Sequence, residues 1–466
     1  MRKFIKTFVC VFSLVVASFG LVACDQEETP AEPVTLTLDM VSLEYVTATY
    51  DGTAKEPVVT VTINEETVDN DEYTITYSNN TNVGTASVVV TANEDSEVID
   101  GTVTANFAIA KGTAVAATYE ELVSALANTN YEKVRLVDFV TIPTGATLVV
   151  PANMELILEE KTIQNRGTIN NQGTITALVK TRGQLLAAFE TANNIKLTAH
   201  IGEVGRWDDI DINAYTRDYK FTLDLNGYNI ASELNFRTWG YYEEEYKYFN
   251  HSIDVTIINT STQVKSAIGR IGDTDDCYYG IMANGKEDLK ISLDNVIVQG
   301  YYGGAYTNGT CNLGGSFTAT NCEFRTSPVN DAVGAYIAAN YDYKFTNCKF
   351  AGSTAYYTKS GSHELTNCTF GSSMTYTNPT YQGSGAAPTG SAIVIDSCVG
   401  DYARELTVVI TGGEITSRYG YGVEECSTAA NGVEKINYAT VQISGVEYNY
   451  CPLGNHKVNE VLKPQA

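Results

Sequence analysis

The chain has 466 residues, and its 55 acidic residues outnumber its 30 basic ones, which leaves a formal net charge of −25. Hydrophobic residues make up 44% of the chain, enough for a folded core, so global disorder is excluded. Nucleic acid is excluded as a partner, because phosphate binding needs clustered Lys and Arg. Charged residues are only 18%, which argues against a coiled coil, and the 31 Tyr favour β structure.

The first 23 residues have the features of a secretory signal. Arg2, Lys3 and Lys6 give a positive start, and an uncharged apolar stretch from Phe8 to Val22 follows. This stretch is shorter than a membrane-spanning helix requires. Residues 1–23 are therefore predicted to be removed on export.

The end of this segment predicts a lipid anchor. Leu21-Val22-Ala23-Cys24 resembles the bacterial lipobox, in which the cysteine becomes the lipid-bearing first residue of the mature protein. We therefore expect a lipid on Cys24 that attaches the protein to the membrane. An ordinary secretory signal that contains a cysteine is the alternative.

Residues 24–33 are predicted to be an acidic tether, kept extended by Pro30 and Pro33. The run Asp25-Gln26-Glu27-Glu28 resembles the signal that sends lipoproteins of Bacteroidetes-like bacteria to the cell surface. The resemblance implies a lipid-anchored protein of the cell envelope, exposed on the outer membrane. A merely solvated tether is the alternative.

Residues 34–111 show the alternation of short strands, broken by turns such as Asp51-Gly52 and Val83-Gly84. The segments Tyr50–Pro57 and Tyr73–Ala86 resemble a bacterial Ig-like repeat of surface proteins. This resemblance implies a β-sandwich that serves as a stalk. The module contains neither His nor Cys, and we interpret it as a spacer.

The next part of the chain contains an internal duplication, in which residues 118–163 recur as residues 181–230. Each copy begins with apolar residues at the i, i+3 and i+4 positions of a short helix, and strands follow: Leu122, Ala125 and Leu126 in the first copy, Leu185, Ala188 and Phe189 in the second. Such helices can cover the open end of a stack of strands. The segment Thr222–Ile230 resembles the entry to a pectin-lyase-like right-handed parallel β-helix. We therefore expect a helix–strand cap with the first coils over residues 112–180 and a β-helix over residues 181–466.

A six-residue phrase recurs in the C-terminal half, at spacings of 26, 26 and 20 residues between its asparagines. One β-helix coil with variable loops fits this spacing, whereas a β-propeller blade needs about 40–45 residues. Looser copies are Ile395–Cys398, Ile410–Ile415 and Ile443–Val446. The clear copies carry three columns of equivalent residues: Asn295, Asn321, Asn347 and Asn367; Cys322, Cys348 and Cys368; and Phe324, Phe350 and Phe370.

These columns have a simple physical interpretation. If coils stack about 4.8 Å apart, equivalent side chains lie above one another. Asn tolerates a left-handed bend and can bond to the Asn of the next coil. The cysteines and phenylalanines are expected to point inward, with Cys398 joining the cysteine column. We favour buried thiols over a metal site or disulfides, because no Cys-x-x-Cys pair is present. A disulfide among Cys277, Cys311, Cys426 and Cys451 stays open.

The resemblance implies an all-β protein: an Ig-like sandwich followed by a right-handed parallel β-helix with short capping helices. Fold does not imply activity, and catalytic β-helices that cut polysaccharide need converging carboxylates with a base. The acidic cluster Asp273, Asp275 and Asp276 could hold calcium or be a solvated turn, and Trp207–Asp211 has the same ambiguity. No other cofactor is expected. The histidines are dispersed, which argues against an enzyme: His200, His251, His363 and His456.

Tyrosines are the main functional clue. Exposed rings beside carboxylates can stack on sugar faces, although Tyr also packs well in any β structure. The candidate glycan contacts, expected in loops, are Tyr241, Tyr242, Tyr278, Tyr279, Tyr301, Tyr302, Tyr356 and Tyr357. The leading hypothesis is a non-catalytic, monomeric surface lipoprotein that contacts polysaccharide or a cell-surface protein. The alternative is a polysaccharide lyase or glycoside hydrolase on the same β-helix.

Overall fold

The computed structural model describes residues 32–202, 209–242, 244–270, 278–285, 288–307, 313–327, 332–380, 386–397, 406–428 and 439–458. The chain divides between Ala110 and Lys111 into two compact units. The expected signal, Cys24 and most of the tether lie outside the described residues. Within these ranges, the helices α1 (Tyr119–Ala127) and α2 (Arg182–Thr191) are both too short to cross a membrane.

The first unit consists of small sheets around one core. Val61 of one sheet packs in the same apolar cluster as Val88 and Phe107 of another, because alternate residues of each strand face inward. A four-stranded sheet has the order β3 (Thr47–Thr49), β9 (Thr102–Ala110), β7 (Gly84–Ala92) and β6 (Tyr73–Ser78). The remaining elements are β2 (Val41–Leu43), β4 (Val59–Ile63) and β5 (Glu66–Thr67) in one sheet, β1 (Val34–Thr35) paired with β8 (Ile99–Asp100), and two 3₁₀ turns at Leu38–Met40 and Asn70–Glu72.

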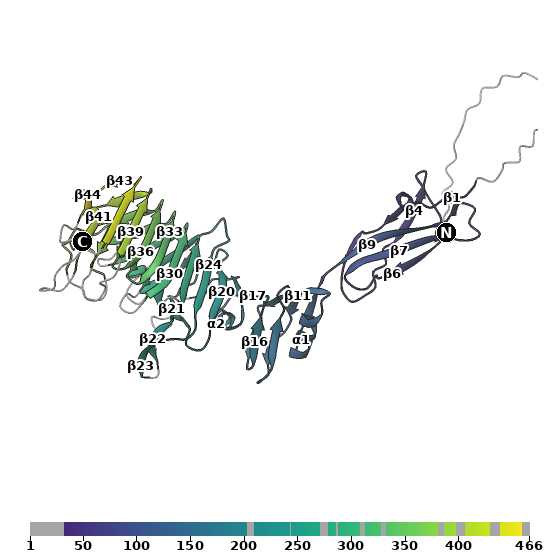
Figure 1. Cartoon of the computed structure of the whole chain (residues 1–466), viewed down its shortest axis with the longest axis horizontal. Coiled ribbons are helices and arrows are strands. Elements are labelled where there is room, and N and C mark those ends of the chain that lie inside the picture. Colours follow the sequence, from purple (N-terminus) through teal and green to yellow (C-terminus); the bar gives the residue numbers. More distant parts are fainter. Residues whose placement is uncertain are drawn as a thin grey trace, which may run out of the picture. The chain divides into compact units, whose positions relative to one another are not determined.

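The second unit is a stack of parallel strands that fits a parallel β-helix (Figure 1). Its longest sheet has 13 strands in this order: β10 (Gly112–Ala116), β11 (Tyr131–Leu136), β14 (Glu155–Glu159), β17 (Thr174–Val179), β18 (Asn194–Leu197), β20 (Tyr219–Asp224), β24 (Ile253–Ile258), β27 (Leu289–Asp294), β30 (Leu313–Thr320), β33 (Asn340–Thr346), β36 (Gly361–Thr366), β39 (Leu406–Thr411) and β42 (Ala439–Ser444).

Two further parallel sheets complete the later coils, so each full coil supplies one strand to each sheet. The nine-stranded sheet has the order β19 (Ile210–Asn213), β21 (Leu234–Arg237), β26 (Tyr279–Asn284), β29 (Gly303–Thr307), β32 (Val333–Ile337), β35 (Thr354–Thr358), β38 (Ile393–Asp396), β41 (Tyr421–Cys426) and β44 (Gly454–Lys457). The seven-stranded sheet has the order β25 (Ser266–Ile268), β28 (Val296–Gly300), β31 (Glu323–Thr326), β34 (Lys349–Gly352), β37 (Thr369–Ser372), β40 (Glu414–Ser417) and β43 (Glu447–Tyr450).

The first coils are built differently, and the two helices lie where the duplication predicts them. Small parallel pairs form their other sides: β12 (Val140–Ile142) with β15 (Ile163–Asn165), and β13 (Thr147–Val150) with β16 (Thr168–Asn171). Thr118 and Thr181 cap the helices by accepting hydrogen bonds from the backbone N–H of Glu121 and Gln184. Helix α1 lies beside the first strand of the long sheet, as a cap should. Helix α2 instead connects β17 to the adjacent strand β18, where the small coils give way to the large ones.

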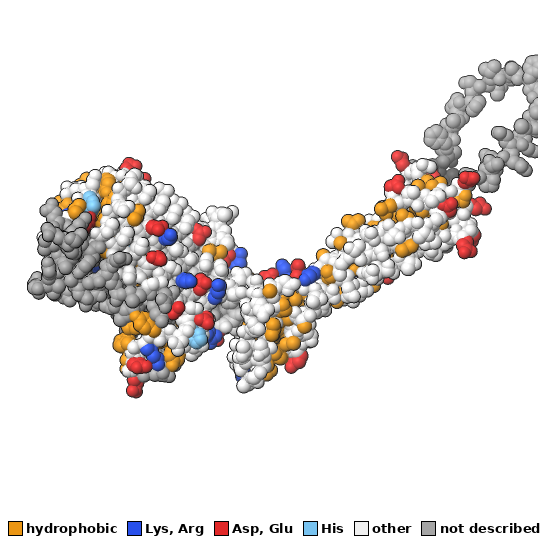
Figure 2. Space-filling view, viewed as in Figure 1, with side chains coloured by type: hydrophobic (Ala, Val, Ile, Leu, Met, Phe, Trp, Pro, Cys, Tyr) orange, Lys and Arg blue, Asp and Glu red, His pale blue; other side chains and the backbone are white. Residues whose placement is uncertain are grey.

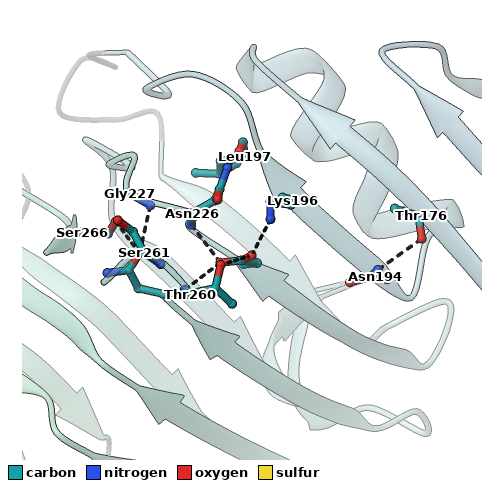
Figure 3. A network of polar contacts seen from close by, with 11 residues as sticks. Thr176, Asn194, Lys196, Leu197, Asn226, Gly227, Thr260, Ser261 and Ser266 are labelled. Carbon is teal, nitrogen blue, oxygen red and sulfur yellow. Dashed lines mark hydrogen bonds and ion pairs between the residues drawn. The ribbon is translucent and has the colours of Figure 1, made fainter. Parts of the chain in front are cut away.

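Polar networks join the turns of neighbouring coils (Figure 3). Asp224, at the end of β20, accepts hydrogen bonds from Asn226 N at 2.8 Å and from Thr260 Oγ1 of the next coil at 2.7 Å. Lys196 of the preceding strand lies 3.4 Å from the same carboxylate. The turn after β20 is thereby tied to the coils before and after it, which helps to fix their register.

The structure places the repeated asparagines at the bend between the 13-stranded and seven-stranded sheets. They adopt left-handed φ angles of 57°, 56°, 54° and 52° in chain order. Asn347 Nδ2 donates to Asn321 Oδ1 at 3.4 Å, from one coil to the one before. In the two following coils Gly412 and Gly445 take this bend with φ angles of 67° and 66°. Residues that tolerate positive φ therefore mark the same corner in these six successive coils.

The inward columns of the phrase are also in register. Phe324 stacks on Phe350 at 5.0 Å between ring centroids, and Phe350 stacks on Phe370 at 5.1 Å. The cysteines Cys322, Cys348 and Cys368 are buried free thiols. The Cys348 Sγ lies 3.4 Å from the Ala319 carbonyl oxygen, so the thiols are weak donors to the neighbouring coil.

The looser copy at Ile395–Cys398 is not a member of the ladder. Ile395 pairs with Thr358 and Glu425 in the nine-stranded sheet, whereas Leu365 of the ladder pairs directly with Ile410. The reason is the long connection from β37 to β38, which inserts about one extra sequence period before the ladder resumes at β39. Cys398 itself, like Cys277 and Cys311, lies outside the described residues.

At the bend we expect Gly to be more stabilising than Ala, the opposite of the order at an ordinary strand position. We expect Asn347→Ala to lower the free energy of unfolding by roughly 1 kcal/mol more than Asn347→Gly, because only Gly adopts the left-handed φ without strain. At Lys349, an exposed strand position two residues later, Gly should instead be worse than Ala. Urea unfolding of the four variants measures this, and the same order at both positions would contradict it.

Candidate functional site

The outer face of the first two strands of the nine-stranded sheet is polar. Ile210, Ile212, Leu234 and Phe236 point into the core and are buried. Because side chains alternate along a strand, the residues between them face outward: Asp211 and Asn213 from β19, Asn235 and Arg237 from β21. Hydrogen-bonding groups of both kinds are therefore gathered on one exposed surface, which we call the polar face.

A two-point ion pair organises the polar face. Arg237 Nε donates to Asp211 Oδ1 at 2.8 Å, and Arg237 Nη2 pairs with Asp211 Oδ2. Both side chains remain partly exposed. Such a fork holds the planar guanidinium and carboxylate in a fixed orientation, with hydrogen-bonding capacity left for a ligand.

Glu233, just before β21, is a carboxyl group of a different kind. It is only 4% exposed, and its Oε2 accepts a hydrogen bond from Tyr279 N at 3.1 Å. Burial, with the neighbouring charges of Asp209 and Asp211, raises the pKa of Glu233 to about 8, against the opposing effect of the Tyr279 N–H. At neutral pH Glu233 therefore holds a proton beside two carboxylates.

The chain leaves β21 directly into an aromatic hairpin, formed by the antiparallel strands β22 (Trp239–Tyr242) and β23 (Glu245–Tyr248). Tyr241 pairs with Tyr246 and Trp239 pairs with Tyr248, so their side chains share one face. The ring of Tyr246 stacks on Trp239 at 5.2 Å and meets Tyr241 edge-on at 5.1 Å. Tyr241, Tyr246 and Tyr248 are 60%, 68% and 41% exposed.

The hairpin is visible as a hydrophobic patch with charged side chains beside it (Figure 2), at the place where Figure 1 labels β22 and β23. Its base is anchored by Phe249, which is buried and packs edge-on against Tyr215 at 5.4 Å. A Cβ atom on Gly240 would lie 3.9 Å from Arg237 Nη1, so the hairpin adjoins the polar face. Because side chains alternate along a strand, Gly240 faces away from the four rings, so Arg237 lies next to the side of the hairpin opposite to them.

A second group of tyrosines lies at the opposite ends of the strands, before β26 and β29. Tyr278 stacks on Tyr302 at 5.4 Å, and Tyr301 meets Tyr302 edge-on at 4.7 Å. Tyr302 is 38% exposed, and Tyr301 and Tyr278 are half-buried. Tyr279 turns towards Tyr306 at 4.7 Å, and burial raises its pKa above the usual range. This group offers less free ring surface than the hairpin.

Two of the predicted glycan contacts are wrong. Tyr356 and Tyr357 lie in strand β35 rather than in a loop, and neither is exposed. Tyr356 points into the core, where its hydroxyl lies 2.7 Å from Nδ1 of the buried His363. Tyr357 points to the outer face, but there it is covered and donates to Asp396 at 2.6 Å. A pair of tyrosines in sequence cannot present both rings on one face of a strand.

The other candidates are divided between described and undescribed parts of the chain. Tyr241 lies in the hairpin, and so does the backbone of Tyr242, whose side chain is not described. Asp273, Asp275 and Asp276 lie outside the described residues. In the part that is described, no three His, Cys, Asp or Glu side chains are grouped so that they could hold a metal ion. Cys426 and Cys451 are free thiols.

Sequence reasoning missed Trp239, Arg237 and Glu233. A signal for Trp239 was present, because Trp239 alternates with Tyr241 just as Tyr246 does with Tyr248 across a Glu-rich turn. For Glu233 there was no local signal, since its environment comes from the strand that holds Asp211 and from Tyr279. Those neighbours are brought in by the stacking of coils.

A polar hollow of about 660 Å³ beside α2 is a weaker candidate. Its lining includes Asp218, Lys220 and Asp254. Lys220 Nζ lies 3.3 Å from Asp254 Oδ2, and hydrogen bonds from Ser252 lower the pKa of Asp218. These charged groups are already satisfied, and the hollow has no exposed aromatic ring.

No family model, curated protein or solved structure matches the chain. The hairpin and the polar face are therefore the basis on which its function is argued.

The environment of Glu233 predicts that Glu233→Gln stabilises the protein, and that the stabilisation depends on pH. The folded protein keeps this proton up to a pKa of about 8, whereas an unfolded glutamic acid loses it near 4.5, so the wild type loses stability as pH rises between these values. Gln can still accept from Tyr279 N. We expect the free energy of unfolding of the variant, relative to that of the wild type, to be about 3 kcal/mol higher at pH 7 than at pH 4.5. Urea unfolding at the two pH values measures this, with the exposed Glu245→Gln as control; a pH-independent difference would contradict it.

Proposed function

We propose that this protein is a non-catalytic surface protein that binds polysaccharide through the hairpin β22–β23 and the adjoining polar face. The observation that carries the proposal is the row of Trp239, Tyr241, Tyr246 and Tyr248 on one face of the hairpin, where the three tyrosines are exposed and Trp239 is half-buried. Aromatic rings of this kind stack on the C–H faces of sugars. The fixed Asp211–Arg237 pair, next to the other side of the hairpin, would supply further partners for sugar hydroxyls.

In this proposal the rest of the chain delivers the site to the cell exterior. A lipid on Cys24 holds the protein to the outer membrane, and residues 24–33 act as the tether. Residues 34–111 serve as an Ig-like stalk, which their separate all-β unit supports. The parallel stack would be a pectin-lyase-like right-handed β-helix that displays the hairpin.

The charge of the site favours neutral sugars. Glu244 and Glu245 are exposed at the turn of the hairpin, and the whole chain is strongly acidic. Uronic acids and sulfated sugars would be repelled by this surface. We therefore expect neutral polysaccharides such as xylan, mannan or glucan to bind in preference to polygalacturonate.

Truncation of one ring tests the proposal. Tyr246 touches both Trp239 and Tyr241, so Tyr246→Ala should weaken binding about tenfold, equivalent to about 1.4 kcal/mol. An array of neutral and anionic polysaccharides identifies a ligand, and calorimetry with that ligand measures the variant. The matched control is Tyr419→Ala, an exposed tyrosine elsewhere in the stack. Equal affinity of wild type and Tyr246→Ala, or no binding to any polysaccharide, would contradict the proposal.

One observation favours a glycoside hydrolase as the second candidate. Such enzymes need a protonated carboxyl group and a carboxylate on either side of the scissile bond. Glu233 retains its proton at neutral pH, and Asp211 lies on the neighbouring strand. The near-complete burial of Glu233 opposes this role, because a general acid must reach the glycosidic oxygen.

A reducing-sugar assay separates the two candidates. We expect the wild-type protein to release no reducing ends from the polysaccharides that it binds, because the side chain of Glu233 is shielded from a ligand on the outer face. Glu233→Gln and Asp211→Asn are the matched variants. If the wild type releases reducing ends, and both variants bind the polysaccharide but release none, the protein is a hydrolase and the non-catalytic proposal is wrong.

A further inference from the structure

A second, unrelated feature lies further along the nine-stranded sheet. Lys359 follows β35, and Asp396 ends the neighbouring strand β38. Because Thr358 pairs with Ile395, Lys359 and Asp396 stand directly opposite each other on parallel strands. Lys359 Nζ lies 3.6 Å from Asp396 Oδ2, and both side chains are completely shielded from solvent.

Apart from the hydrogen-bond donors to Asp396, apolar and aromatic residues lie beside this pair. Strand register puts Ala338 beside Lys359 and Cys426 beside Asp396. Both belong to a buried cluster over the outer face of the sheet, together with Val333, Tyr336, Tyr357, Ala387 and Val394. Removing an ammonium and a carboxylate from water in such a place costs several kcal/mol for each ion.

The carboxyl group of Asp396 is surrounded by donors. Tyr357 OH and Thr428 Oγ1 each donate to Oδ2 at 2.6 Å, and Thr428 N donates to Oδ1 at 2.9 Å. Fixed donors of this kind polarise a carbonyl group and stabilise the oxyanion that forms when a nucleophile attacks it. Burial, together with the charge of Asp396, raises the pKa of Tyr357 well above its usual value, so its hydroxyl retains the proton that it donates.

We propose that Lys359 and Asp396 condense to form an intramolecular amide bond. One ammonium proton passes to the carboxylate, and the lone pair on Nζ attacks Cγ to form the C–N bond. A Cγ–O bond then breaks, and the oxygen leaves as water with two of the three protons that Nζ carried, while the third stays on the amide nitrogen. The step is a condensation within the chain and needs no oxidant or co-reactant. Because the two groups are held close together in a fixed geometry, the activation barrier is lower than for free reactants.

The bond would replace two buried charges with a neutral amide. It would also join β35 to β38 across the long connection that separates them in sequence, which restricts the unfolded chain as a disulfide does. Cys426, beside Asp396, is a free thiol, so no disulfide supplies this constraint there. The cross-link is independent of glycan binding.

Peptide mass spectrometry of the purified full-length protein tests the proposal. Digestion with trypsin should give a branched peptide about 18 Da lighter than its two linear parts, with no cleavage after Lys359. The ion pair of Glu424 with the partly exposed Lys457, 2.8 Å apart, serves as the control that stays linear. Full recovery of linear peptides ending at Lys359 would overturn the proposal.

Two variants keep the test independent of misfolding. Lys359→Met fills the same space without an amine and should give only linear peptides. Tyr357→Phe keeps the ring but removes one donor to Oδ2, and should lower the cross-linked fraction at least tenfold at equal times after synthesis. An unchanged cross-linked fraction in Tyr357→Phe would show that the hydrogen bond from Tyr357 to Asp396 does not promote the reaction. A branched peptide in Lys359→Met would show that the bond involves a different amine.

Discussion

The structure depends above all on the strict register between parallel strands of successive coils. Backbone hydrogen bonds join each strand to its equivalent in the coils before and after, so equivalent residues lie directly above one another. Every side chain is therefore a member of a column. Within the core this produces the stacked phenylalanines and the row of thiols. Stability is spread along the stack, because each coil buries its apolar face against its neighbours.

The same constraint organises the outer face of the nine-stranded sheet, whose character changes along a single column. In chain order this column contains Asp211, Asn235, Met282, Tyr306, Tyr336, Tyr357, Val394, Glu424 and Lys457. Its first members are polar and partly open to solvent. Its middle members are aromatic. Its last two are charged: Glu424 is buried under the chain that connects β37 to β38, and Lys457 is partly exposed. The open end of the face is thus the part suited to a ligand, and the covered end is suited to locking the structure.

Buried charge takes two forms at the covered end. Glu424 accepts hydrogen bonds from Thr389 and Ser391 and pairs with Lys457, so the last strand and the covering segment are tied to one carboxylate. Asp396 has donors around it and an opposing amine at longer range. The first arrangement is a satisfied ion pair with a partly exposed lysine. In the second, both charged groups are fully enclosed, so replacing them with a neutral amide removes the cost of burying them.

Much of the fold follows from local patterns. The two helices follow from apolar residues at i, i+3 and i+4 after a capping threonine, and the ladder follows from asparagines that tolerate a left-handed bend. The sequence was less informative where the spacing broke down. The copy at Ile395–Cys398 has the right letters but belongs to another sheet, because a long connection shifted the pattern.

By itself, the sequence determined an acidic, all-β chain with a repeating coil, because periodicity and turn chemistry are properties of neighbouring residues. Only the tertiary structure decided which tyrosine rings are exposed and so available to a ligand. Tyr241 and Tyr357 occur in similar Tyr-Tyr pairs, yet one is exposed on a hairpin and the other is sealed under a distant segment. It also brought Glu233 to Asp209, and Lys359 to Asp396. Such contacts join residues that are far apart in the chain, and their burial depends on what the intervening loops cover, which no local pattern encodes.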